Sequence, residues 1–113
     1  MTSYLGDTVA IAPRRTTNQG WSAYQVPRYS YRFDVAVNGI PTCVGSTHLQ
    51  DVAFVFNNIS GEGYEGYTAN PFGNMTEGDN KNFVDLSSLM SGSWVSFVVD
   101  QDPNGHGAEG VKR

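Results

Sequence analysis

The chain has 113 residues, of which 39% are hydrophobic and 12% aromatic, which is above the range of disordered segments and long enough for one domain. Its formal net charge of −4 and isoelectric point near 4.8 argue against nucleic acid and anionic membrane surfaces as partners, because both would repel the average surface. No apolar run is long enough to span a bilayer, and the first residues do not have the charged-then-apolar pattern of a signal peptide.

The first expected helix runs to about Ala23, with an uncertain beginning. Asp7 is expected to cap it, because a short carboxylate accepts hydrogen bonds from the unpaired backbone N–H groups of a first turn. Pro13 leaves two alternatives open. It is tolerated in the first turn of a helix that begins near Ala12, and it kinks a longer helix.

A strand is expected from Val26 to Asp34. Aromatic residues alternate there with polar ones, so that one face of the strand is apolar and the other polar: Tyr29, Tyr31 and Phe33 against Arg28, Ser30 and Arg32. A strand of this kind suits the margin of a sheet. A lone strand leaves its backbone groups unpaired on both edges, so the remaining strands are expected to come from sequence outside this chain. The residues therefore indicate a fragment of an α/β protein.

An isolated histidine, His48, follows this strand in a polar loop. Residues 38–41 predict a turn, and residues 42–47 form the loop that leads to the histidine. The segment Leu49 to Phe56 fits a short helix or a strand, and the helical spacing of its apolar residues favours the helix. Cys43 is the only cysteine, so no disulfide closes within the chain, and a buried free thiol is expected.

Residues 57–80 show no sustained period, and a helix follows from about Asn82 to Asp100. One apolar stripe marks this helix: Phe83, Leu86, Met90, Trp94, Phe97 and Val98. The polar residues from Asp100 to Gly105 imitate the first half of a calcium loop, but the twelfth position is Val111 where a glutamate is needed. A turn that ends the helix is the better interpretation, and no metal is expected.

The surroundings of His48 resemble a known family. Asp51 follows it by three residues, and an apolar segment then ends in Val55-Phe56. This pattern is similar to the histidine motif of the type B carboxylesterases, which include cholinesterases and fungal extracellular lipases. Further similarities are colinear across most of the chain: Gly6-Asp7 with Pro13-Arg14-Arg15, the segment Tyr29 to Phe33, Trp94 to Phe97, and Asp102 to Asn104.

The resemblance implies an α/β-hydrolase fold, of which residues 1–113 would be a single partial domain from the C-terminal portion. That portion would comprise a late sheet strand, the histidine loop and the C-terminal helix, and would be incomplete on its own. The implied activity is hydrolysis of a small-molecule or lipid ester by a serine triad, without metal or organic cofactor. No Gly-x-Ser-x-Gly elbow occurs in the chain, so the serine and the acidic partner are expected in the remainder of the hydrolase domain.

His48 would be the triad base that takes the serine proton and returns it to the departing alcohol, a task that suits imidazole near neutral pH. An isolated histidine near an apolar stretch is more often structural, but its place after a strand end favours catalysis. Asp51 would steady the loop by a hydrogen bond, or simply face solvent. Leu49 replaces the glycine that usually follows the histidine in the family.

Two rival interpretations remain at this point: a non-catalytic cholinesterase-like binding or adhesion domain, and an inactive truncated fragment. Asn58 and Asn74 begin Asn-x-Ser/Thr triplets that accept an N-glycan in a eukaryotic secretory pathway, or are ordinary polar loop residues. A secreted, glycosylated protein is expected chiefly from the resemblance.

Overall fold

The computed structural model describes residues 2–64, 69–73 and 81–108. The chain divides into two compact units, Met1–Arg32 and Phe33–Arg113. Within the described ranges every regular element is a helix, so the α/β-hydrolase fold remains a prediction. The single partial domain expected over residues 1–113 also remains a prediction.

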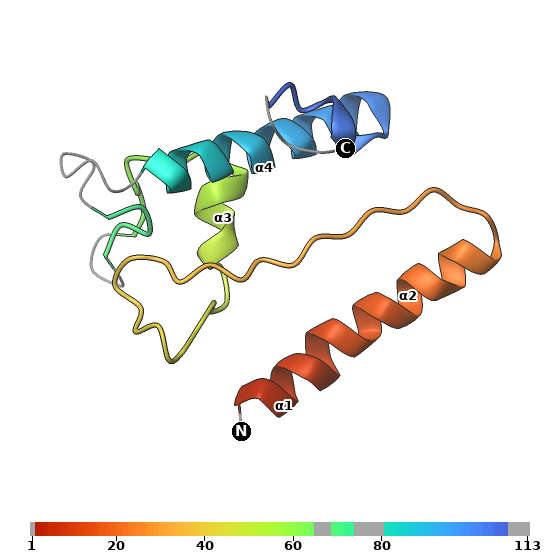
Figure 1. Ribbon diagram of the computed structural model, residues 1–113, viewed down its shortest axis with the longest axis horizontal. Helices are drawn as coiled ribbons and strands as arrows, with labels where there is room; N and C mark the ends of the chain where they lie inside the picture. Colours follow the sequence, from red (N-terminus) through yellow and green to blue (C-terminus); the bar gives the residue numbers. More distant parts are fainter. Residues whose placement is uncertain (1, 65–68, 74–80, 109–113) are drawn as a thin grey trace. The chain divides into compact units, whose positions relative to one another are not determined.

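The first unit contains one continuous helical rod, which Figure 1 shows from the N-terminus to the end of α2. The rod joins α1 (Thr2–Gly6), a π-helical turn (Asp7–Ile11) and α2 (Ala12–Ala23). In the wider turn, Ala12 donates its N–H to Asp7 O, five residues back. Pro13 is the second residue of α2 and directly follows the wider π-helical turn. This local change in the backbone hydrogen bonds accommodates the proline ring and the missing N–H within a long helix.

The expected capping role of Asp7 is wrong. The helix already runs through the residue before it, since Gly6 has helical angles of −58° and −42°. The carboxylate makes no side-chain capping bond there because a helical N–H in the interior has a backbone partner. Helical structure begins at Thr2 instead, six residues before Thr8, where a helix capped by Asp7 would begin.

Residues 26–37 form no strand, in contrast to the expectation for Val26 to Asp34. The chain leaves α2 through Gln25, which has a left-handed φ of 56°, and Arg14 then donates a 2.7 Å hydrogen bond to Ser30 Oγ. A strand requires a neighbouring strand to pair its backbone groups, and the described residues offer none. None of the first unit's residues from 4 to 32 is buried, so this unit has no core of its own.

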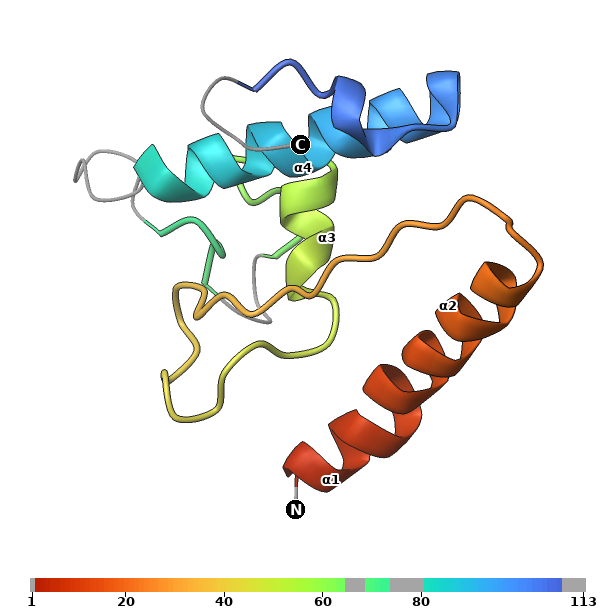
Figure 2. The same ribbon diagram turned by 45° about the vertical axis from the view of Figure 1, so that its right-hand side comes forward.

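The second unit is built around α3 (Gln50–Val55) packed against α4 (Lys81–Asp100), an arrangement visible in both Figure 1 and Figure 2. Phe54 of α3 is completely buried and lies at the centre of the core. Its ring centroid is 4.5 Å from that of Phe72, 5.1 Å from Phe33 and 5.8 Å from Phe83. Three aromatic contacts from three separate segments therefore hold α3 in place.

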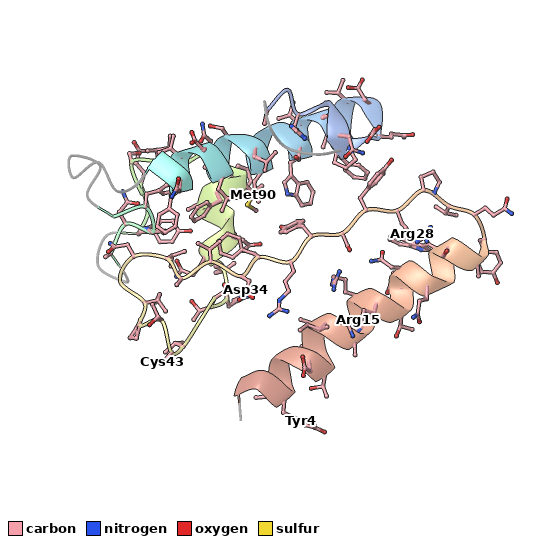
Figure 3. The ribbon with its side chains drawn as sticks, viewed as in Figure 1. Tyr4, Arg15, Arg28, Asp34, Cys43 and Met90 are labelled. Atoms are coloured by element: carbon pink, nitrogen blue, oxygen red, sulfur yellow. The ribbon has the colours of Figure 1, made fainter. Side chains whose placement is uncertain are left out.

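Both helices predicted around this core are confirmed. The apolar spacing that favoured a helix after His48 yields α3, and the stripe that began at Phe83 yields α4. Only the first half of that stripe packs on the core, up to Met90, which Figure 3 labels beside the meeting point of α3 and α4. Val98 in the second half is 74% exposed.

The helix α4 ends as the sequence indicated, in a turn. Gln101 has a left-handed φ of 59°, and a short 3-10 helix, η2, follows at Pro103–Gly105. Asp102 Oδ1 accepts hydrogen bonds from the backbone N–H and the side-chain amide of Asn104, at 3.0 and 2.7 Å. Ser96, buried in α4, donates to Asp102 O at 2.6 Å and ties this turn back to the helix.

Candidate functional site

The loop that carries His48 ends in a tight turn. Gln50 donates its backbone N–H to Thr47 O at 3.4 Å, so His48 and Leu49 are the two central residues of the turn. Leu49 has φ 67° and ψ 3°, whereas His48 has no positive φ. These angles fit a type II β-turn, whose third residue needs a positive φ and is usually glycine. The imidazole of His48 is exposed at this turn.

Two side chains anchor the backbone of the histidine loop. Ser46 Oγ donates to Val35 O at 3.0 Å, before the histidine. Tyr64 donates its phenolic O–H to Leu49 O at 3.1 Å, after the histidine. His48 is therefore bracketed by two long-range hydrogen bonds, although its own side chain is exposed.

The helix that follows the histidine, α3, is held by contacts with α4. Ala53 and Phe54 of α3 are buried, at 1% and 0% exposure. Ser87 of α4 is fully buried, and its hydroxyl reaches Phe54 O at 3.0 Å and Asn57 Oδ1 at 2.9 Å. Burial of apolar side chains and the contacts of Ser87 therefore fix the C-terminal half of α3 on the core, at the opposite end of the helix from the histidine turn.

Asp51 lies in the first turn of α3 and is half-buried. A carboxylate is favoured there because the helix dipole places partial positive charge at the N-terminus. Asp51 thus lies in the first turn of the helix that follows the turn of His48. Whether Asp51 supports the histidine loop stays a prediction.

Two residues beside His48 were missed by sequence reasoning. Tyr64 lies in a segment without periodicity, where nothing pointed to a contact with residue 49. Gln50 is only 6% exposed, and its Oε1 has no hydrogen-bond partner in the part of the chain that the structure describes. Glutamine is usually exposed, so a glutamine at the start of a short helix is expected at the surface. The burial of Gln50 therefore could not be predicted from the sequence.

Cys43 is exposed in the turn after Pro41, where Val44 donates its N–H to Pro41 O at 2.9 Å, so the prediction of a buried thiol is wrong. Figure 3 shows the cysteine at the tip of the loop. The residues of this turn all face solvent, because the turn projects from the core that α3 and α4 build.

Of the two expected glycosylation sites, Asn58 lies just after α3 and Asn74 lies outside the described residues. The Asn58 amide donates to Glu62 O at 2.8 Å, and its carbonyl oxygen accepts from Glu62 N at 3.1 Å and from Ser60 Oγ at 3.4 Å. The triplet therefore forms a compact polar turn.

Among residues 2–64, 69–73 and 81–108, no three acidic, histidine or cysteine side chains gather closely enough to hold a metal ion. In the same ranges, no helix has both the length and the apolar character needed to cross a bilayer.

The comparison with protein families identifies the class of protein that contains this turn. The model of the carboxylesterase family matches residues 1–112. The chain therefore belongs to the carboxylesterase family, a family of ester hydrolases, and the resemblance carried by the histidine segment and its flanks is confirmed at that level. No curated protein and no solved structure matches the chain significantly.

Proposed function

We propose that His48 is the general base of a serine carboxylesterase of the type B branch, related to the fungal extracellular lipases, and that this chain forms the C-terminal part of its hydrolase domain. The observation that carries the proposal is an exposed histidine on a turn whose backbone is anchored on both sides. A catalytic base needs an accessible imidazole on a well-placed backbone, and His48 has an exposed side chain between two backbone anchors. Membership of the carboxylesterase family supports the same role.

In this proposal the imidazole accepts the proton of a serine hydroxyl as the oxygen attacks the ester carbonyl. The same imidazole then protonates the departing alcohol, and a second cycle with water releases the acid. The serine, the carboxylate that orients the imidazole and the oxyanion-hole donors belong to the remainder of the hydrolase domain. Asp51 acts indirectly, by steadying the start of α3. The substrate class is a small-molecule or lipid ester.

The experiment compares His48→Ala with His106→Ala in the full-length hydrolase that contains this chain, using a short-chain chromogenic ester. These are the only two histidines of the chain, so the second variant controls for loss of a histidine as such. Because the triad acts as a unit, His48→Ala is expected to lower kcat by about four to six orders of magnitude, with a much smaller effect on KM. His106→Ala should retain most of the activity.

Asp51→Asn extends the same comparison. Loss of a supporting carboxylate is expected to lower kcat by about tenfold or less, since geometry would be disturbed without removal of a reacting group. Circular dichroism establishes that each variant is folded. Near-normal turnover in a folded His48→Ala enzyme would overturn the proposal, because another group would then be the base. Absence of ester hydrolysis by the unsubstituted full-length protein would instead favour a non-catalytic binding or adhesion domain.

Secretion with glycosylation belongs to the same proposal. The Asn58 triplet supports it, because a glycosylated amide keeps one N–H and can still donate to Glu62 O. Expression through a eukaryotic secretory pathway, followed by mass measurement before and after glycosidase treatment, tests it against Asn58→Gln. Identical masses before and after treatment would contradict glycosylation at this site.

A further inference from the structure

The residue after the histidine adopts a backbone conformation that leucine disfavours. Leu49 has a φ of 67°, in the left-handed region where the Cβ of an ordinary residue crowds the backbone. Its side chain is 57% exposed, so the side chain gains little from packing that would offset this strain. Something other than the preference of residue 49 must hold the turn.

The turn's own hydrogen bond is long and contributes little by itself. The contact from Gln50 N to Thr47 O is 3.4 Å, longer than the usual 2.7–3.2 Å for such a bond. The helix start adds little, since α3 has no side-chain cap at Leu49. Local interactions therefore leave the conformation of residues 48 and 49 underdetermined.

The Leu49 carbonyl has two donors, one from the helix start and one from a residue 15 positions away. It accepts the O–H of Tyr64 at 3.1 Å and the backbone N–H of Val52 at 3.3 Å. Both bonds are longer than usual, and two donors on one carbonyl restrain the peptide plane between residues 49 and 50 more than either bond alone. The orientation of that plane sets the ψ angle of Leu49. It thereby also sets how His48 is oriented relative to α3.

Tyr64 is itself well placed to act as an anchor. It is half-buried and packs against the core around Phe54, and its backbone N–H donates to Gly61 O at 3.1 Å. Gly61 is buried with a φ of 70°, and a Cβ there would come within 2.6 Å of the Asn70 side chain. The Tyr64 hydroxyl therefore belongs to a residue that is packed against the core.

We propose that Tyr64 is a positioning residue for His48: its hydroxyl holds the Leu49 carbonyl, stabilises the left-handed conformation of residue 49, and so keeps the imidazole at one place. The inference rests on the proposed function of His48 for its kinetic consequence. Its structural part, the dependence of the turn on the hydroxyl, is measured separately.

Tyr64→Phe is the direct perturbation, because it keeps the aromatic ring and removes only the hydroxyl. In the full-length hydrolase, kcat is expected to fall by about three- to tenfold, the range of a single neutral hydrogen bond. KM should change by less than about twofold, since no substrate contact is removed.

Rescue distinguishes positioning from a general loss of stability. Glycine adopts a positive φ without steric cost, so Leu49→Gly should restore most of the kcat of Tyr64→Phe. Leu49→Ala is the matched control, since it removes nearly the same side chain but keeps the Cβ that opposes the left-handed conformation. The alanine double variant should remain as slow as Tyr64→Phe alone.

The resonance of the His48 imidazole gives a readout that does not depend on catalysis. In Tyr64→Phe it should shift or broaden, and return with Leu49→Gly but not with Leu49→Ala, while the His106 resonance stays constant. This pattern together with an active His48→Ala enzyme would retain the positioning role and reject the proposed function. An unchanged His48 resonance in Tyr64→Phe, or equal rescue by glycine and alanine, would overturn the positioning role.

Discussion

Replacement of Phe54 by alanine tests whether this side chain is the centre of the core formed by α3 and α4. The side chain is fully buried and contacts three aromatic rings, at centroid distances from 4.5 to 5.8 Å. Truncation of such a phenylalanine costs about 3–5 kcal/mol of unfolding free energy. Because whole domains are stable by only about 5–15 kcal/mol, the change is expected to remove much of the stability of the second unit.

Hydrogen exchange of the α4 backbone amides measures this loss in the purified chain. Each 1.4 kcal/mol changes an equilibrium tenfold, so protection should fall by about two to four orders of magnitude or disappear. Phe56→Ala is the matched control. This phenylalanine lies two residues further on and is 76% exposed, so its removal should change stability by less than about 0.5 kcal/mol. Equal effects of the two variants would refute the assignment of Phe54 to the core centre.

Two further predictions follow from burial and hydrogen bonding. Ser87→Ala removes the hydroxyl that reaches Phe54 O and should lower the free energy of unfolding in urea by about 1–2 kcal/mol. Ser88 is exposed, so Ser88→Ala should lower it by less than about 0.5 kcal/mol. Similar values for both variants would contradict the buried hydrogen bond. The helical rod of residues 2–23 has no buried residue in its described part, so its amides should exchange far faster than those of α4 in the isolated chain. Comparable protection in the two helices would show that the first unit is stable by itself.

The helices of the second unit could be predicted because their evidence is local. Apolar residues spaced by three and four positions define α3 and α4, and that spacing is a property of the chain itself. The turn after Val37 was equally readable, since Gly39 supplies the φ of 81° that the turn requires. The family could also be identified from the sequence, since the model of the carboxylesterase family matches residues 1–112.

The predictions that failed concern boundaries and burial. Asp7 has the side chain of a helix cap, but helical residues precede it, and a cap is defined by what lies upstream. Cys43 is a residue type that is usually buried, yet its turn points away from the core. The strand pattern from Val26 to Asp34 describes a surface that needs a pairing partner, which a pattern alone does not supply.

What the sequence by itself determined is membership of the carboxylesterase family and the two helices of the core, α3 and α4. The helices depend on residues close together in the chain, and the family rests on a match along residues 1–112. The tertiary structure alone decided how His48 is held. The bond from Tyr64 to Leu49 spans 15 residues, and the contacts of Ser87 with the end of α3 span 30 and 33. Such contacts leave no periodic signal, because they depend on how the folded chain brings distant segments together.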